Sequence, residues 1–202
     1  MTGIIERLRQ QAKTNPKRVL LPEQYDERVL RAAEILSASG LAIPVLLVRG
    51  ERELPGVEIF AERTDAQQWR DRAVTTLVEA RKAKGMTVEQ AKTALENPLL
   101  LATVLLRMGF ADAGVAGSIA TTADVLRAGI QGLGLAPAAK LVSSFFLMEL
   151  TDHRVLTYAD CAVVPAPNSN ELAEIALCSA ASHQSLTSET PKVAMLSFST
   201  KG

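Results

Sequence analysis

Short apolar runs alternate with amphipathic helical segments through the first half of the chain, and this alternation constrains the fold more than any other feature. Residues 18–22 (RVLLP) are typical of a short buried strand, residues 26–40 (DERVLRAAEILSASG) of a helix closed by a glycine, and residues 43–48 (IPVLLV) of a second strand. A helix that connects two strands in this way makes them parallel. The sequence therefore predicts an α/β fold, a largely parallel sheet with helices on both faces.

The pattern changes near residue 140. From there three strands are predicted in quick succession, in residues 140–150 (KLVSSFFLMEL), 154–160 (RVLTYAD) and 161–165 (CAVVP). A helix, predicted over 169–182, and a further strand, predicted over 192–199, follow them. A parallel sheet normally continues from such a strand into a covering helix, so the second domain is expected to be incomplete at its C-terminal end. We predict two domains, residues 1–138 and residues 139–202.

Charge and composition narrow the classes of partner. Lys plus Arg and Asp plus Glu both total 22, and no basic block could follow a nucleic acid or an anionic membrane. The N-terminus lacks the apolar core of a signal peptide, and no later apolar run is long and uncharged enough to span a bilayer. Cys161 and Cys178 lack the spacing of metal ligands and are expected to be reduced thiols. We therefore expect a cytoplasmic protein that has no nucleic-acid or membrane partner and holds any bound anion through a few local groups.

One stretch, residues 115–129 (VAGSIATTADVLRAG), runs from an apolar strand end through small and hydroxylated residues into a helix. In α/β sheets ligands bind beyond the carboxyl ends of the strands, where unpaired N–H groups at a helix start suit phosphate. Gly117 would let the backbone approach a ligand closely. The side chains that could donate hydrogen bonds to an anion are those of Ser118, Thr121, Thr122 and Arg127. The sequence indicates an anion-binding turn.

The same residues are open to a structural interpretation. Thr121 or Thr122 could simply cap the helix, Gly117 could only end a strand, and Arg127 could be a solvated surface residue. Neither the dinucleotide-fold nor the nucleotide-triphosphate glycine signature is present. The pattern alone leaves both interpretations open.

Other candidate residues carry weaker signals. His153 and His183 lie far apart in the sequence and are expected to be structural or solvated. Arg81 begins the segment RKAKG, which either complements a helix dipole or reaches a distant phosphate. Residues 199–202 (STKG) are similar to phosphate-binding loops.

Five collinear segments, in their order and separations, resemble the phosphate acetyltransferases and their phosphate butyryltransferase relatives. They are VLLPEQYDERVLRAAEIL (19–36), RKAKGMTVEQA (81–91), AGSIATTADVLRAGIQ (116–131), ADCAVVPAPNSNELAEIALCSA (159–180) and PKVAMLSFSTKG (191–202). The resemblance covers the chain from about residue 4 to Gly202. It implies a three-layer α/β/α fold of two domains, like that of the isocitrate and isopropylmalate dehydrogenases, with a cleft between the domains and usually a homodimer.

The activity that the resemblance implies is transfer of an acetyl group between acetyl phosphate and coenzyme A, giving acetyl-CoA and phosphate. Coenzyme A is then a substrate, no cofactor is tightly bound, and no metal takes part in the chemical step. Carried over residue by residue, the implied substrate contacts are Arg81, Gly117, Ser118, Thr121, Thr122, Arg127, Ser199, Thr200 and Lys201. Two positions depart from the family pattern, because many members have a histidine in place of Ala120 and a proline in place of Ala128.

Catalytic residues are not assigned, because the family's thiol-orienting and proton-accepting residues lie beyond Gly202. The 202 residues are therefore expected to be an N-terminal part with impaired activity, which a second, C-terminal polypeptide could complete. If the chain turned over alone, His153, Asp124 and Asp160 would be the candidate bases.

Two alternatives stay open, and a third is disfavoured. The chain could be a phosphate butyryltransferase, or a non-catalytic acyl-CoA-binding or dimerisation module of the same family. A dehydrogenase of the same broad fold is disfavoured, because the sequence shows neither a dinucleotide fingerprint nor an acidic metal cluster.

Overall fold

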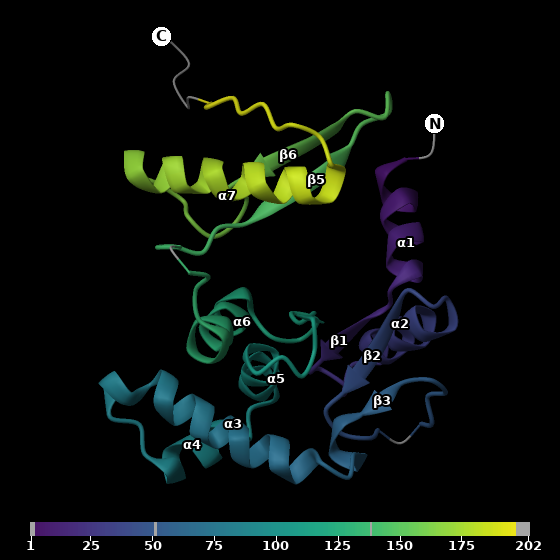
Figure 1. Ribbon diagram of the computed structural model, residues 1–202, viewed down its shortest axis with the longest axis vertical. Helices are drawn as coiled ribbons and strands as arrows, with labels where there is room; N and C mark the ends of the chain where they lie inside the picture. The colour runs from purple at the N-terminus through teal and green to yellow at the C-terminus, as the bar shows by residue number, and fades with distance from the viewer. Residues whose placement is uncertain (1–2, 51, 138, 197–202) are drawn as a thin grey trace. The chain divides into compact units, whose positions relative to one another are not determined.

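The computed structural model describes residues 3–50, 52–137 and 139–196 (Figure 1). The chain divides into two compact units: residues 11–134 form the larger unit, and the described residues of 1–10 and 135–202 form the smaller one. Residues 3–10, which the sequence-based division assigns to the first domain, group with the smaller unit.

A four-stranded parallel sheet forms the centre of the larger unit. Its strands are β1 (Lys17–Leu21), β2 (Ala42–Leu46), β3 (Glu58–Ile59) and β4 (Ala113–Gly114), in the order β3-β2-β1-β4. The predicted α/β class with a parallel sheet is confirmed. Because β4 pairs with β1, the loops that follow these two strands leave the same edge of the sheet side by side.

The helices and helical turns of the larger unit lie between these strands in the sequence or follow the last of them. They are α2 (Glu27–Ala38), α3 (Ala66–Ala80), α4 (Val88–Ala94), α5 (Pro98–Arg107) and α6 (Thr122–Ala128), with the 3-10 turns η1 (Phe60–Glu62) and η2 (Lys82–Lys84) and the π-helical turn η3 (Gly129–Leu133). The helix α5 begins directly after Asn97, because the Asn97 side chain accepts the N–H groups of Leu99 and Leu100 and Pro98 occupies the first turn.

The core of the larger unit lies on both faces of its sheet. Leu20 and Val45 pack in one cluster with residues of α3 and α5, including the fully buried Leu105. The neighbouring residues Leu21 and Leu46 point to the opposite face and pack with α2. Burial on both faces explains why β1 and β2 read as continuous apolar runs rather than as alternating ones.

The smaller unit contains an antiparallel pair, β5 (Phe145–Glu149) and β6 (Val155–Ala159), and the long helix α7 (Ser169–Thr187). The helix α1 (Ile4–Thr14) begins in this unit, where the Arg7 guanidinium donates to the carbonyl oxygen of Thr187 at 3.2 Å. None of the described helices is long and apolar enough to span a bilayer.

Two strands expected in the smaller unit do not form. Residues 161–165 (CAVVP) make a turn, because the N–H groups of Ala162 and Val163 donate to the Asp160 carboxylate instead of to a neighbouring strand. The strand predicted over 192–199 is wrong for its described part, residues 192–196, which pair with no strand of the described chain. Residues 197–199 lie outside the described residues.

Candidate functional site

The predicted anion-binding turn lies between β4 and α6 in the larger unit. It leaves the carboxyl end of β4, beside the loop that leaves the carboxyl end of β1 (Figure 1). Val115 and Ile119 are 63% and 64% exposed, so the loop lies at the surface of its unit. This is the position in a parallel sheet at which ligands bind.

The backbone amides of this loop are already occupied by a carboxylate of the same chain. Oε2 of Glu23 accepts the N–H groups of Gly117 and Ser118 at 2.5 and 2.8 Å. Its other oxygen, Oε1, accepts those of Ile119 and Ala120 at 2.9 and 2.7 Å. Glu23 stands two residues after β1 and is only 7% exposed. The amides that the sequence offers to a phosphate therefore donate to Glu23.

Burial alone would raise the pKa of Glu23. The N–H groups of Ala120, Ile119, Ser118 and Gly117 outweigh that effect and hold the pKa below its usual value. The side chain is therefore a carboxylate at neutral pH, and the N–H groups face a full negative charge.

A second set of contacts joins the same two loops. Asp26 caps α2 by accepting the N–H of Arg28 at 2.8 Å, and it also accepts the hydroxyl of Ser118. The Arg28 guanidinium donates to the carbonyl oxygen of Ser118 at 2.7 Å. Hydrogen bonds from the Arg28 side chain, and then from Ser118, hold the pKa of Asp26 well below its usual range. Ser118 is thereby bound through its N–H, its hydroxyl and its carbonyl.

The start of α6 carries the remaining predicted donors. Thr121 caps the helix, as the structural interpretation allows: its Oγ1 accepts the N–H of Asp124 at 3.2 Å and donates to the Asp124 carboxylate at 2.7 Å. The Arg127 guanidinium pairs with the same carboxylate at 2.7 Å and is 63% exposed. Thr122 is exposed, and its hydroxyl makes no hydrogen bond to the described part of the chain. The side chains of Thr122 and Arg127 are thus accessible to a ligand.

The other predicted contacts are not brought to this loop. Arg81 follows the last residue of α3 and is partly buried, and it forms no ion pair or hydrogen bond with the described residues of the loop. Ser199, Thr200 and Lys201 lie outside the described residues. Glu23 was missed by the sequence interpretation, although it stands directly after a predicted strand, in the segment LPEQ.

The two candidate bases of the smaller unit, Asp160 and His153, have partners, and so does His183. The Asp160 carboxylate accepts the hydroxyl and the N–H of Ser144 at 2.7 and 3.0 Å. His183 lies 2.9 Å from the hydroxyl of Thr157 through its Nδ1, and His153 lies 3.2 Å from the Glu149 carboxylate. All of these partners belong to the smaller unit.

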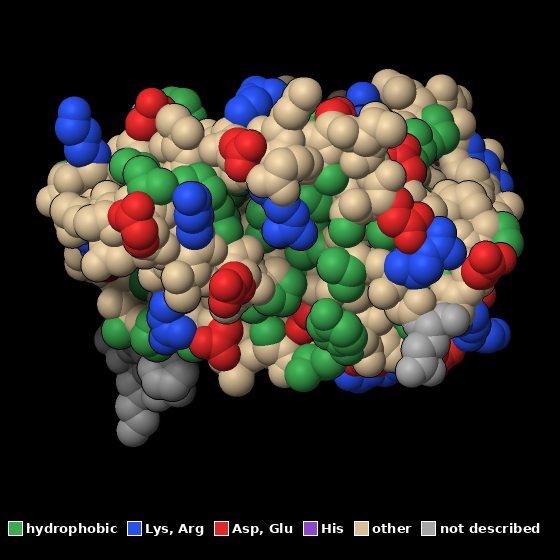
Figure 2. Space-filling model, turned by 90° about the horizontal axis from the view of Figure 1, so that it is seen from below, with side chains coloured by type: hydrophobic (Ala, Val, Ile, Leu, Met, Phe, Trp, Pro, Cys, Tyr) green, Lys and Arg blue, Asp and Glu red, His purple; other side chains and the backbone are tan. Residues whose placement is uncertain are grey.

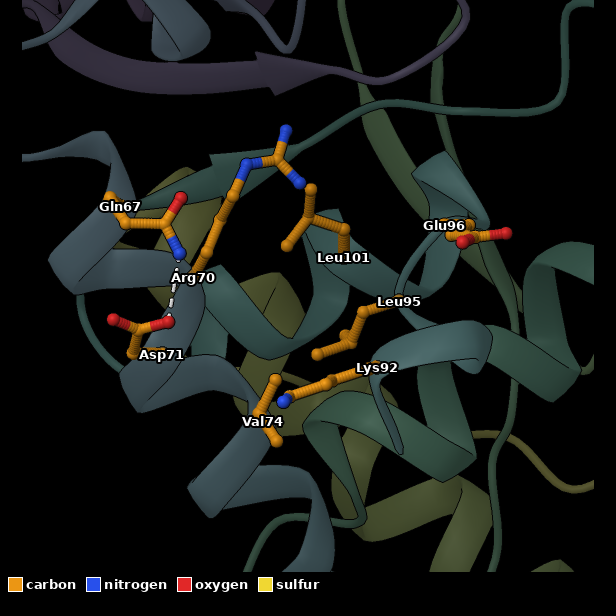
Figure 3. A pocket seen from close by; sticks show the side chains of 8 residues that line it. All are labelled: Gln67, Arg70, Asp71, Val74, Lys92, Leu95, Glu96 and Leu101. Atoms are coloured by element: carbon orange, nitrogen blue, oxygen red, sulfur yellow. Dashed lines mark hydrogen bonds between the residues drawn. The ribbon is translucent and has the colours of Figure 1, made fainter. Parts of the chain in front are cut away.

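A shallow hollow of about 200 Å³ lies between α3, α4 and α5 (Figure 3). Val74, Leu95 and Leu101 give it an apolar floor, and acidic and basic side chains stand around it. Its lining includes none of the described residues predicted for the site. The surface in Figure 2 likewise shows Lys and Arg interspersed with Asp and Glu rather than gathered into one basic patch.

Comparison with known proteins bears on the whole chain. A family model described as "Phosphate acetyl/butaryl transferase" matches residues 3–202. The phosphate acetyltransferase of Thermoanaerobacterium thermosaccharolyticum is 42% identical over 213 residues, covering 99% of this chain and 64% of the relative. That of Paracoccus denitrificans is 41% identical over 205 residues, covering 98% and 63%.

Solved structures agree with this match. A phosphotransacetylase from Staphylococcus aureus superimposes with a TM-score of 0.83 at 32% identity, covering 100% of this chain and 64% of that one. One from Streptococcus pyogenes gives a TM-score of 0.82 at 32% identity. The chain thus spans slightly less than two thirds of the length of these relatives. Matched along nearly all of its residues in both sequence and structure, it belongs to the phosphate acetyl/butyryl transferase family.

Proposed function

We propose that the protein is a phosphate acetyltransferase, which transfers an acetyl group between acetyl phosphate and coenzyme A. The observation that carries the proposal is the family match over residues 3–202, together with relatives named phosphate acetyltransferase at 42% and 41% identity. The accessible side chains of Thr122 and Arg127, at the ligand-binding edge of the sheet, support it.

The chemistry needs donors for a leaving phosphate. The coenzyme A thiolate attacks the carbonyl carbon of acetyl phosphate, the carbon–sulfur bond forms, and the bond from that carbon to the phosphate oxygen breaks. Phosphate leaves with the electron pair, and hydroxyl and guanidinium donors stabilise its charge. The thiol proton passes to a base for which we propose no residue.

The proposed substrate contacts are side chains rather than loop amides, since Glu23 occupies the amides. Arg127 would exchange its ion pair with Asp124 for the phosphate, which a 63% exposed guanidinium can do without unfolding its helix. Arg81, Ser199, Thr200 and Lys201 complete the proposed set of contacts. The proposal also includes coenzyme A as a substrate rather than a bound cofactor, a homodimer, and a cytoplasmic location.

A second candidate function, a non-catalytic acyl-CoA-binding module, is favoured by Ala120, whose methyl group cannot donate to phosphate as a histidine would. Such a module would bind acetyl-CoA without turning it over. Preference for a butyryl over an acetyl group is a third outcome that the same assay can detect, when butyryl phosphate replaces acetyl phosphate.

The test is thioester formation from acetyl phosphate and coenzyme A, comparing the wild-type chain with Arg127→Ala. We expect the substitution to lower kcat/KM about tenfold or more, because it removes a charge-assisted hydrogen bond to phosphate. Arg31→Ala is the matched control, since Arg31 is an exposed arginine on α2. Binding of acetyl-CoA in calorimetry without any turnover would favour the non-catalytic module, and unchanged turnover in Arg127→Ala would remove Arg127 from the site.

A further inference from the structure

The Glu23 carboxylate is enclosed by four consecutive backbone N–H groups, two on each oxygen. Such a run of amides curved around one point is an anion-binding concavity. Gly117 begins the run with φ +105°, a backbone conformation that residues with a Cβ atom rarely adopt. The loop thus has the geometry of an anion site, and the anion in it belongs to the protein.

The Glu23 carboxylate is held firmly by the loop, because it is charged, buried and bound by four N–H donors. Glu23 is 7% exposed, and every one of the four distances lies between 2.5 and 2.9 Å. A phosphate from solution could reach these amides only by displacing the carboxylate from all four of its N–H donors. Displacement of Glu23 by substrate is therefore disfavoured.

The hydrogen bonds from the amides of residues 117–120 to Glu23 also determine where the neighbouring side chains lie. Ala120, the last residue that donates to Glu23, is followed directly by Thr121, the cap of α6, and then by the exposed Thr122. The hydrogen bond between Ser118 and Asp26 fixes the other side of the loop against the start of α2. A shift of the loop would thus move Thr122 and Arg127 together.

We propose that Glu23 is a positioning residue for the substrate phosphate: it is the resident anion of the amides of residues 117–120, and it orients the loop so that phosphate meets the side chains of Thr122 and Arg127. The part that concerns substrate rests on the proposed function. Glu23 itself makes no contact with the substrate in this arrangement and acts through the loop.

The test titrates inorganic phosphate into the wild-type chain, Glu23→Gln and Glu23→Ala by calorimetry, with and without formate. Glu27→Gln is the matched control, because Glu27 lies on the same segment, is 70% exposed and, among the residues that the structure describes, pairs with Arg52 alone, at 2.8 Å. We expect both Glu23 variants to bind phosphate about tenfold more weakly than wild type, as for the loss of one good hydrogen bond.

Formate separates the resident anion from other effects of the substitution. In Glu23→Ala the truncated side chain leaves room for a small carboxylate among the four amides, so formate should restore phosphate binding and raise the unfolding temperature. In wild type and in Glu23→Gln, where the position is filled, formate should change neither. Because the glutamine variant keeps the volume of the side chain, it stays informative if the alanine variant does not fold.

Three outcomes would overturn the proposal. Tighter phosphate binding in Glu23→Ala would show that Glu23 competes with substrate for the amides. Unchanged phosphate binding in both variants, with a lower unfolding temperature, would show a purely structural role. Wild-type protein that neither binds phosphate nor forms thioester would refute the proposed function and the positioning role with it, whereas the formate-dependent rise in unfolding temperature would still establish the resident anion.

Discussion

Two loops of the molecule, one in each unit, are built around a carboxylate that accepts backbone N–H groups, but the carboxylates come from different distances along the chain. Asp160, directly after β6, accepts the N–H groups of Ala162 and Val163 at 2.7 and 2.9 Å, two and three residues away. Glu23 accepts N–H groups that lie 94 to 97 residues away. The first loop forms within its own segment, and the second exists only after β1 and β4 have paired.

This difference determines what each carboxylate stabilises. Ser144, which immediately precedes β5 and lies 16 residues from Asp160, also donates to the Asp160 carboxylate. The contacts of Asp160 therefore stay within a short stretch of the chain. Glu23 joins the loop that follows β1 to the loop that follows β4, and Asp26 and Ser118 add a second link between the same loops. Removing Glu23 should therefore affect the whole larger unit, and removing Asp160 should affect mainly one turn.

The largest effect is expected from Glu23→Ala, which leaves four N–H groups without their charged acceptor. We expect the free energy of unfolding to fall by about 3 kcal/mol, because buried donors that lose a charged partner are costly. The fluorescence of Trp69, the single tryptophan of the sequence, reports on α3 in the larger unit and provides the measurement in urea. Glu27→Ala is the control, and a loss below about 1 kcal/mol for Glu23→Ala would show that water replaces the carboxylate easily.

A smaller effect is expected from Asp160→Asn. The asparagine oxygen can still accept the N–H groups of Ala162 and Val163, and only the acceptor for the Ser144 N–H is lost. We expect a loss of about 1–1.5 kcal/mol, measured by circular dichroism, with a smaller shift in the Trp69 transition than Glu23→Ala causes. An equal shift of that transition by both variants would contradict the distinction between local and long-range loops.

Acid should weaken both loops in the same direction. The N–H groups around Glu23 hold its pKa below the usual value despite burial. Burial likewise opposes the lower pKa of Asp160, but the N–H of Val163 and the hydroxyl of Ser144 outweigh it and bring the pKa to about 2. A carboxylate with a lowered pKa contributes stability at pH values above its unfolded pKa, about 4, and this contribution is lost as the pH falls through the folded pKa.

The test of this pH dependence compares unfolding free energies from pH 7 down to about 3 for wild type and Glu23→Gln. Wild type should lose stability below about pH 4, and the glutamine variant, which has no proton to bind at this position, should lose less, so that the two curves converge. Parallel curves would mean that the pKa of Glu23 is not lowered in the folded protein.

The sequence predicted the features that depend on short-range patterns better than those that depend on contacts between distant segments. The alternation of apolar runs and helical segments predicted the parallel sheet, and α7 begins at the first residue of the helix predicted over 169–182. The loop after β4 was recognisable from Gly117 and its hydroxylated neighbours. The Glu23 carboxylate that this loop binds was not recognisable. The order of strands along the chain does not show that β4 lies beside β1 rather than at another position in the sheet.

The strand predicted over residues 161–165 does not form, and the reason is a contact between neighbouring residues. Its apolar residues match a strand pattern, but Asp160 stands immediately before them and captures the N–H groups that a neighbouring strand would need. A short polar side chain next to an apolar run was thus the signal that could have corrected the prediction. No comparable local signal exists for Glu23, whose donors lie in another part of the chain.

The smallest effect separates the two threonines at the start of α6, and with them the structural and ligand-binding interpretations of the turn. Thr121→Ala should cost about 1 kcal/mol of unfolding free energy, because its Oγ1 accepts the N–H of Asp124. Thr122→Ala should leave stability unchanged, since its exposed hydroxyl has no partner in the described chain, and should weaken phosphate binding several-fold. The opposite result would be weaker phosphate binding in Thr121→Ala and unchanged binding in Thr122→Ala. If Thr121→Ser, which keeps a hydroxyl at the helix cap, then restored phosphate binding, the capping residue itself would contact the anion. The amides held by Glu23 would in that case orient Thr121 rather than Thr122, and the long-range loop would serve the site through one residue that also begins the helix.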